Sequence, residues 1–468
     1  MTYLDDMREA CFRQLTFQQA QAAYYLSYYD NEPPILALLD TEERQTFRKF
    51  LDESQTNWCE LIVNSVAERM MVVGFNWGDS SDAAWSLWQG NRMDADGELV
   101  QTDGLVTGMG YALVQPDDDN PTGVSITPES PLEVTVMYEP GDRRERLAGY
   151  KRFTDHAQNV TEVLILPDVI ATWEPGNAGE PVVEDNPAGL VGLVEVRPQP
   201  RTVGPPRSEL DPAIPVVDRI HTTTFNRLVA SDYGAFRQIW ATGIKLARQL
   251  ITSADGSTTE VAVKPWDIGA NRLLVSENEA AKMGAFPGDS LTGYLAAVAE
   301  DVTHMAAITQ TPAHYLVGRM VNLSADAIKA AEAGLVAKTR RRMLHVGEAW
   351  EDVIRIALGL IGDPGAANMA GEVIWRDPET RSDAQVVDAL TKLATLGVPR
   401  EVLWAKWGAS PQEIQQWRGM ADAEAATAAA NQAAALGAGD IAQLIAAGST
   451  PPAQPSPASA NGSAGNGG

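Results

Sequence analysis

The chain has 468 residues, of which 62 are acidic and 36 basic, so its formal net charge is −26. This charge argues against a protein whose outer surface clamps nucleic acid, because phosphate binding relies on clustered lysine and arginine. The chain has only two cysteines, which predicts no disulfide framework. The start MTYLDDMREA does not have the pattern of a signal peptide, and no apolar run reaches the roughly 18 residues that a membrane span needs. We therefore expect a soluble, intracellularly made protein.

The first 75 residues are predicted to be helical. Thr41 is a suitable N-cap, and apolar residues then recur every three or four positions until Gly74. Another helix is expected to begin near residue 81. The stretch around Asp96-Gly97 is interpreted as a tight turn and Gly104 to Tyr111 as a flexible turn, since neither keeps the spacing of a calcium or nucleotide loop.

The period of the apolar pattern changes to two between about 122 and 174. Alternation over 132–139, followed by the turn Pro140-Gly141-Asp142, predicts a β-hairpin, and EVLILPDVIATWEP is expected to extend the same antiparallel sheet. The segment EPGNAGEPVVEDNPAGL, rich in glycine, proline and asparagine, is predicted to be a loop.

Helical patterns return after the proline-rich segment RPQPRTVGPPRSEL. One helix is predicted from about 212 to 243 and a second from about 289 to 308, with a compact insert between them that carries hairpin chemistry at Asp255-Gly256. A longer helix is expected from Ser324 to about 361. A short strand, GEVIWRD, then precedes two or three helices that end near 420.

Motifs for catalysis and metal binding are missing. No GxxxxGK[ST] phosphate loop and no GxSxG elbow occur, and the two cysteines have no CxxC partner. None of the five histidines forms an HxxxH or HExxH pair. We therefore expect no catalytic residue, no metal site and no cofactor, although the sequence leaves an unrecognised hydrolase open as an alternative.

Two segments resemble nucleic-acid-binding elements. The run Arg340 to Arg342 would point in three directions on a helix, which favours a solvated face or ion pairs with acidic neighbours over DNA contact. Residues 399–417, which lie within VPREVLWAKWGASPQEIQQW, have the order of a helix-turn-helix. Because few cations accompany it, a packed helical hairpin is favoured, and a DNA-binding regulator remains the alternative function.

Residues 311–323 join two predicted helices and raise the question of a functional site. Thr311-Pro312 disfavours helix before the proline, and Ser324 is a good N-cap, so a hinged loop is expected. Arg319 would carry its charge, with His314 and Tyr315 at its tips. Alternatively, residues 315–317 and Met320 pack against the rest of the chain while Arg319 pairs with a neighbouring acid.

Four segments in order resemble the portal proteins of tailed bacteriophages, of the type common in siphophages of actinobacteria. They are NSVAERMMVVGF, RSELDPAIPVVDRIHTTTFNRL, FRQIWATG and TQTPAHYLVGRMVNLSADAIKAAEAGLVAK. The resemblance covers about 24–419. His221 stands where asparagine is usual in the family, and the chain after about 430 matches nothing.

This resemblance implies a mainly helical α+β portal fold that assembles as a ring, expected to be a dodecamer, around a central DNA channel. The implied regions are an α+β wing (1–206), a first stem helix (207–242), a clip (243–285), a second stem helix (286–308), a tunnel loop (309–323), a long wing helix with a return strand (324–381), a helical crown (382–430) and a disordered tail (431–468).

The resemblance also implies the roles of particular residues. The DNA-facing residues of the tunnel loop would be Thr311, Pro312, His314, Tyr315, Arg319 and Asn322, and the clip residues that dock terminase or adaptor would be Lys264, Trp266 and Asp267. Implied partners are further copies of the chain, the terminase large subunit, head-completion or adaptor proteins, the major capsid and scaffolding proteins and passing double-stranded DNA. The protein would be assembled in the host cytoplasm and reside at the portal vertex of the virion, without membrane contact.

Overall fold

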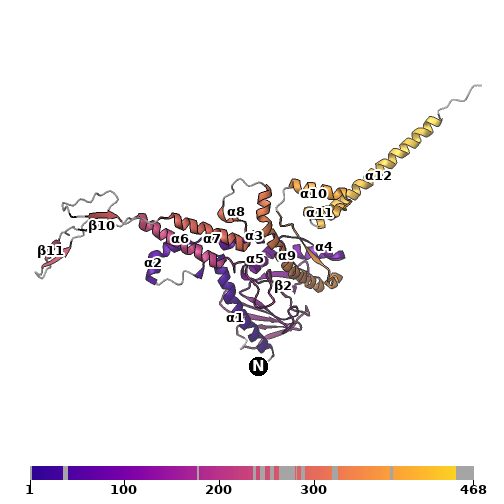
Figure 1. The fold of residues 1–468 in the computed structure, drawn as a ribbon. Coiled ribbons are helices and arrows are strands. Elements are labelled where there is room, and N and C mark those ends of the chain that lie inside the picture. Colours follow the sequence, from indigo (N-terminus) through magenta and orange to yellow (C-terminus); the bar gives the residue numbers. More distant parts are fainter. Residues whose placement is uncertain are drawn as a thin grey trace, which may run out of the picture. The chain divides into compact units, whose positions relative to one another are not determined.

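The computed structural model describes residues 3–34, 41–176, 179–235, 239–242, 248–252, 258–262, 280, 282–285, 290–318, 325–379, 383–409 and 411–448. The chain divides into two compact units, Met1–Thr380 and Arg381–Gly468. Mixed helix and sheet build the first unit, whereas the described part of the second is helical (Figure 1).

The first unit begins with three helices, and two more precede the first extended sheet. Their bounds are α1 Tyr3–Tyr29, α2 Thr41–Ser54, α3 Trp58–Ala67, α4 Ser81–Gly90 and α5 Met93–Thr107. The predicted continuous helix from Thr41 to Gly74 is wrong. It is interrupted before α3, where the Asn57 side chain accepts a hydrogen bond from the Glu60 N–H as an N-cap. Gly74 lies within strand β1, Val72–Asn76.

Antiparallel strands form the next layer. A three-stranded sheet has the order β3-β2-β9 and a five-stranded sheet the order β4-β5-β6-β7-β8. The bounds are β2 Gly110–Pro116, β3 Val124–Glu129, β4 Val134–Tyr138, β5 Arg146–Thr154, β6 Val160–Ile165, β7 Val169–Trp173, β8 Val182–Asp185 and β9 Leu193–Val196. The β4–β5 pairing confirms the predicted hairpin. The segment predicted as a loop instead contributes β8, which pairs with β7.

Two helices, α6 Ile214–Ala235 and α7 Thr292–Thr309, run side by side (Figure 1). Between them lie β10 Ile239–Thr242, β11 Arg248–Thr252, β12 Thr258–Ala262 and β13 Lys282–Ala285. β11 pairs with β12 across the predicted hairpin. The predicted helix boundary at 242 is wrong because 239–242 pair with β13, so the two ends of the insert meet in a short sheet.

A short helix and a long helix follow, α8 Ala313–Val317 and α9 Ala325–Leu360, and then strand β14 Glu372–Trp375. β14 pairs with β1, which joins segments about 300 residues apart in sequence. α9 packs against β2, β9 and β14 and against α4. It therefore connects the sheets to the helical layer.

The main core contains a group of aromatic side chains from distant segments. The rings of Trp88 on α4 and Trp350 on α9 meet edge to face with centroids 5.2 Å apart. The predicted turn at Asp96-Gly97 is wrong, since both residues lie inside α5. A Cβ at Gly97 would stand 3.1 Å from the Trp88 ring, so the helix uses glycine for close packing rather than for a turn.

The second unit contains α10 Asp383–Thr395, α11 Arg400–Trp407 and α12 Pro411–Gly448. The last residues of the chain were expected to form a frayed helix and a disordered tail from 431, and α12 continues past 431 to Gly448. Alanine dominates this stretch and has the highest intrinsic helix propensity of all residues. Residues 449–468 lie outside the described part of the chain.

Candidate functional site

The candidate loop is a short helix held between two turns. α7 ends at Gln310, whose φ of 55° is left-handed, and Gly318 after α8 has a φ of 64°. The remaining predicted loop residues, Arg319 and Asn322, lie outside the described residues, as do the predicted clip residues Lys264, Trp266 and Asp267.

The described half of this loop packs against the body of the first unit. Thr311 is 2% exposed and Leu316 5%, and Pro312 is also buried. The Thr309 hydroxyl donates a hydrogen bond of 3.1 Å to the Thr311 hydroxyl. Of the residues named in the packed alternative, Leu316 is buried but Val317 is 51% exposed, so that alternative holds only in part.

Tyr315 joins α3 and α9 through its hydroxyl group. The Arg69 guanidinium, just after α3, donates a hydrogen bond of 2.8 Å to the Tyr315 oxygen, and the Tyr315 hydroxyl donates one of 2.8 Å to Glu332 on α9. Arg69 and Glu332 also form an ion pair of 3.8 Å, with side chains 12% and 11% exposed. The expectation that Tyr315 forms an exposed tip is therefore corrected, because its hydroxyl has two charged partners inside the chain.

His314 lies beside the same group. Its ring meets that of Tyr315 edge to face with centroids 4.6 Å apart, and its Nε2 atom lies 3.9 Å from a Glu332 oxygen. The His314 side chain is 8% exposed, so it too is not the exposed tip that the sequence suggested. We refer to Arg69, His314, Tyr315 and Glu332 as the loop anchor.

Tyr315 acts as a structural contact of the loop anchor and not as an acid–base group. Burial raises the pKa of Tyr315, and the hydrogen bond to the Glu332 carboxylate raises it further. The phenol therefore keeps its proton near neutral pH and remains a donor to Glu332. A group held in one protonation state positions the loop and does not transfer protons.

A second buried polar group holds the C-terminal end of α7 against the middle of α9. The Lys338 ammonium donates a hydrogen bond of 2.7 Å to the Thr309 carbonyl oxygen and lies 3.6 Å from Glu209. Arg342, one turn further along α9, donates directly to Glu209, and Gln199 donates to the same carboxylate at 2.8 Å. We call Glu209, Lys338 and Arg342 the buried triad.

The buried triad has a clear electrostatic cost. Each of its side chains is less than a tenth exposed. Burial lowers the pKa of Lys338, and only the nearby Glu209 carboxylate works against that effect. Lys338 also caps a carbonyl of the last turn of α7, so the position of that helix end depends on the charge of Glu209.

Sequence reasoning missed both groups. A usable signal existed on α9, where Glu332, Lys338 and Arg342 follow the spacing of the buried positions Leu335 and Val346. Charged residues on the apolar stripe of a helix need partners inside the protein. The sequence does not show that these partners are Arg69, Glu209 and Tyr315, which come from three separate segments.

The two segments that resemble nucleic-acid-binding elements, Arg340 to Arg342 and residues 399–417, make contacts within the chain. Arg340 pairs with Asp377 at 3.1 Å and Arg342 with Glu209, which confirms ion pairing for these members of the basic run. Rings of Trp404 on α11 and Trp417 on α12 meet edge to face at 5.5 Å, as expected for a packed helical hairpin.

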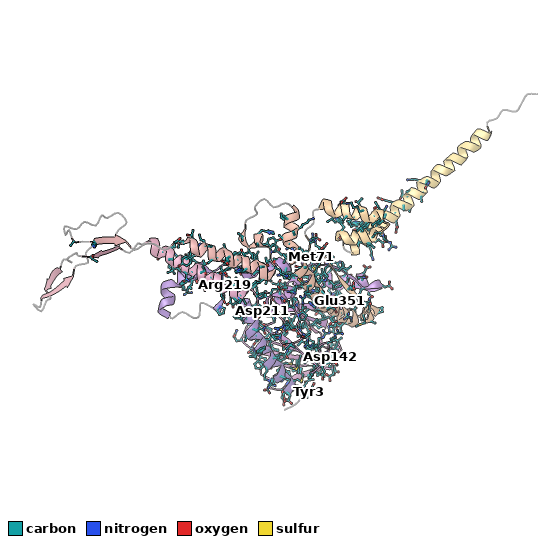
Figure 2. All side chains as sticks on the ribbon, viewed as in Figure 1. Tyr3, Met71, Asp142, Asp211, Arg219 and Glu351 are labelled. Atoms are coloured by element: carbon teal, nitrogen blue, oxygen red, sulfur yellow. The ribbon has the colours of Figure 1, made fainter. Side chains whose placement is uncertain are left out.

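The described residues contain neither a candidate metal site nor a membrane-spanning helix. No cluster of three or more histidine, cysteine, aspartate or glutamate side chains in this part of the chain could hold a metal ion. Among the same residues, no helix combines the length and hydropathy needed to cross a membrane. Figure 2 shows the side chains of the first unit, with Asp211 and Arg219 labelled near the start of α6.

Comparisons with known proteins agree on one family. The sequence profile described as "Phage portal protein, SPP1 Gp6-like" matches residues 14–427. The chain is 29% identical over 456 residues to the portal protein of Mycobacterium phage L5, covering 92% of this chain and 89% of that protein. It is also 29% identical over 421 residues to the portal protein of Mycobacterium phage D29, covering 85% and 83%.

A solved structure, "Virion of native gene transfer agent (GTA) particle", is similar with a TM-score of 0.39 and 14% identity, covering 78% of this chain and 88% of that one. This structural likeness is weak, whereas the sequence matches span nearly the whole chain.

Proposed function

Because this chain belongs to the phage portal protein family of the SPP1 Gp6-like type, we propose that it forms a ring at one vertex of the capsid, through which double-stranded DNA is packaged and ejected. It is a structural component of the virion and not an enzyme. The observation that carries the proposal is the family match over residues 14–427, which includes the three-stranded and five-stranded sheets, the α6–α7 pair and the long helix α9.

The regions of the chain are proposed to divide as the family resemblance implies. The sheets with α1 to α5 and the helix α9 would form the wing, α6 and α7 the stem, and the helices of the second unit the crown. The β strands between α6 and α7 would form the clip. Support for the clip comes from the pairing of β10 with β13, which makes the insert a separate structure at the end of a helix pair.

The charge of the chain suits a channel through which DNA slides. Each phosphate neutralised by a cation adds salt-dependent affinity, so a duplex moves more freely past a surface with few cations. With a formal net charge of −26, an assembled ring would repel the DNA backbone from most of its surface. The ring, expected to be a dodecamer, would conduct DNA without holding it.

We propose that the tunnel loop contacts DNA through Arg319 and Asn322, while the loop anchor fixes its other end. The described residues Thr311, Pro312, His314 and Tyr315 would then support the loop rather than touch DNA in this conformation. Arg319→Glu should leave ring formation intact, because exposed loop substitutions usually change stability by about 0.5 kcal/mol or less. DNA filling of heads built with the variant should fall. Normal filling would remove Arg319 from the DNA-facing residues.

We further propose that the clip docks the terminase large subunit during packaging and head-completion or adaptor proteins afterwards. Replacing Lys264, Trp266 and Asp267 together with alanine should spare ring formation and weaken capture of the terminase subunit by immobilised rings. Loss of rings with unchanged capture by the residual rings would contradict this role.

The other proposed contacts are with the major capsid protein and the scaffolding protein during assembly in the host cytoplasm. The whole function is tested by assembling heads with and without this chain and measuring DNA packaged in the presence of terminase and ATP. Heads that contain the chain should protect genome-length DNA from nuclease. Equal protection in heads that lack it would contradict a portal function, and ATP hydrolysis by the purified chain alone would contradict a purely structural role.

A further inference from the structure

The two edge strands of the five-stranded sheet differ, because another element of the chain covers β4 and leaves β8 uncovered. Along β4, Gln14 of α1 donates a hydrogen bond to the Val136 carbonyl oxygen and Gln18 one to that of Val134, both at 2.9 Å, and Gln19 donates one of 2.6 Å to Leu132, just before the strand. α1 therefore covers this edge and satisfies its backbone acceptors.

The opposite edge, β8, is open. All four of its residues are exposed, and its only strand neighbour among the described residues is β7. Val182 and Val183 remain 43% and 49% exposed. An uncovered edge strand with exposed β-branched side chains is a site at which another chain can add, unless charges prevent it.

Acidic side chains surround this open edge. Glu184 and Asp185 end β8, and Glu174 and Glu180 precede it, all of them exposed. No cation of the described residues lies within ion-pair distance of these four carboxylates. We call Val182, Val183, Glu184 and Asp185 the acidic edge.

A wide cleft lies between the β4–β5 turn, β9, α9 and β14. It encloses about 1240 Å³, more than the roughly 300–1,000 Å³ of a small-molecule pocket, so it suits a polypeptide segment. Figure 2 labels Glu351 of α9, which lines the cleft. Exposed apolar side chains at its rim are Leu344, 63% exposed, and Met369, 78% exposed.

Arginines give this cleft an electrostatic character unlike that of the whole chain. Seven arginines and six carboxylates line it, whereas the chain carries a net charge of −26. Arg146 and Arg355 share Asp352, and Arg197 pairs with Glu195. Arg143 and Arg144, both exposed, have no carboxylate partner in the described part of the chain, and Arg143 donates only to the Arg201 carbonyl oxygen.

We propose that the acidic edge of one copy of the chain seats in this arginine-lined cleft of the next copy. The two surfaces are complementary. Each has exposed apolar side chains, and the carboxylates of the acidic edge are opposite in charge to Arg143 and Arg144 of the cleft. Guanidinium groups of Arg143 and Arg144 would receive the carboxylates of Glu184 and Asp185 in charge-assisted hydrogen bonds. Val182 and Val183 would cover Leu344 or Met369. This inference rests on the proposed ring and names the surfaces that form it.

The position of the two surfaces fits closure of a ring. They lie at opposite flanks of the same sheet, because the cleft includes the β4–β5 turn and β8 is the far edge in the order β4-β5-β6-β7-β8. A head-to-tail interface needs two different complementary patches on each subunit, and it generates a ring when the rotation between neighbours closes.

Charge reversal with rescue tests the interface. Two double variants of the full chain, Arg143→Glu with Arg144→Glu and Glu184→Arg with Asp185→Arg, should each assemble only at protein concentrations at least about tenfold above those of the wild type, because like charges then face each other. The four-residue combination restores opposite charges and should assemble within about threefold of the wild type. Mass photometry across a concentration series measures the ring fraction.

Two controls make the result decisive. Asp118→Arg with Asp119→Arg reverses two exposed neighbouring carboxylates outside both surfaces and should leave assembly unchanged. The neutral pair Arg143→Gln with Arg144→Gln should weaken assembly less than charge reversal does. Such a graded effect distinguishes a loss of charge attraction from misfolding of the variant. Wild-type rings with unaffected reversal variants, or a combination without rescue, would overturn this interface while leaving the portal function intact. A wild-type chain that forms no rings would overturn both.

Discussion

The buried triad of the first unit and the ion pairs of the second unit use the same chemical groups in opposite surroundings. Lys338 and Glu209 have side chains that are 5% exposed each, whereas Lys392 and Asp388 of α10 are 74% and 65% exposed. Water screens the pair on α10, so its members depend little on each other. In the triad, removal of one partner leaves a charge without solvent or counter-charge. Burial decides which ion pairs hold the chain together.

The largest expected effect is at Glu209. Glu209→Ala leaves Lys338 and Arg342 buried without their common carboxylate, and breaking a buried ion pair costs about 3–5 kcal/mol. Chemical unfolding of the full chain, followed by tryptophan fluorescence of the first unit, measures this loss. Because Lys338 also donates to the Thr309 carbonyl oxygen, amide exchange at the end of α7 should accelerate as well. A loss of unfolding free energy below about 1 kcal/mol would show that the buried triad contributes no more to stability than an exposed ion pair does.

Asp103 extends the comparison between buried and exposed charges. Its carboxyl group is partly buried and has no cation partner among the described residues. Burial raises its pKa from 3.8 to about 6. The folded chain therefore binds this proton more tightly than the unfolded chain, and the stability gained at acidic pH is lost as the pH rises through about 6. Relative to Asp103→Asn, the wild type should lose about 2 kcal/mol between about pH 4 and about pH 7.

Thermal unfolding of both chains across this pH range checks the sign. Equal pH dependence of wild type and Asp103→Asn would show that Asp103 is solvated like an ordinary surface carboxyl. A wild type that gains stability relative to the variant as pH rises would reverse the assignment.

Tyr315→Phe tests the loop anchor. The change removes the hydroxyl between Arg69 and Glu332 but keeps their ion pair of 3.8 Å, so the expected loss of about 1–2 kcal/mol is smaller than at Glu209. Amide exchange in α8 should become faster while the C-terminal half of α9 keeps its protection. Unchanged exchange in α8 would show that the hydroxyl does not hold the loop.

The smallest effect is expected in the second unit. Lys392→Ala removes one member of an exposed pair on α10 and should change stability by about 0.5 kcal/mol or less, with a salt dependence that matches screening. It is also the matched control for the Glu209 variant, because each removes one charge of a lysine–carboxylate pair. A loss as large as that at Glu209 would contradict the role given to burial.

Much of the fold followed from local patterns in the sequence. Alternation over 132–139 and the Pro140-Gly141 turn predicted the β4–β5 hairpin, and the predicted bounds of α7 and α9 lie within a few residues of the observed ends. Local patterns failed where distant contacts decide the structure. Gly74 terminates no helix because β1 pairs with β14, and Gly97 forms no turn because Trp88 packs against it.

The candidate site was less predictable than the fold. Thr311-Pro312 correctly indicated a break between two helices, but the polar residues that follow the break looked like exposed tips. Whether Tyr315 is exposed depends on Arg69 and Glu332, which lie 246 and 17 residues away in sequence. A single sequence does not show which distant residues contact one another.

Electron microscopy of the purified full-length chain, in negative stain and then in ice, tests the central claim most directly. A portal protein of this family should appear as closed rings with a central hole and one dominant subunit number, expected to be twelve. If α6 and α7 form the proposed stem, the image classes should show a narrow extension that leads to the proposed clip. A population of monomers or dimers at concentrations where assembly is complete for a ring-forming protein, with no closed rings, would contradict it.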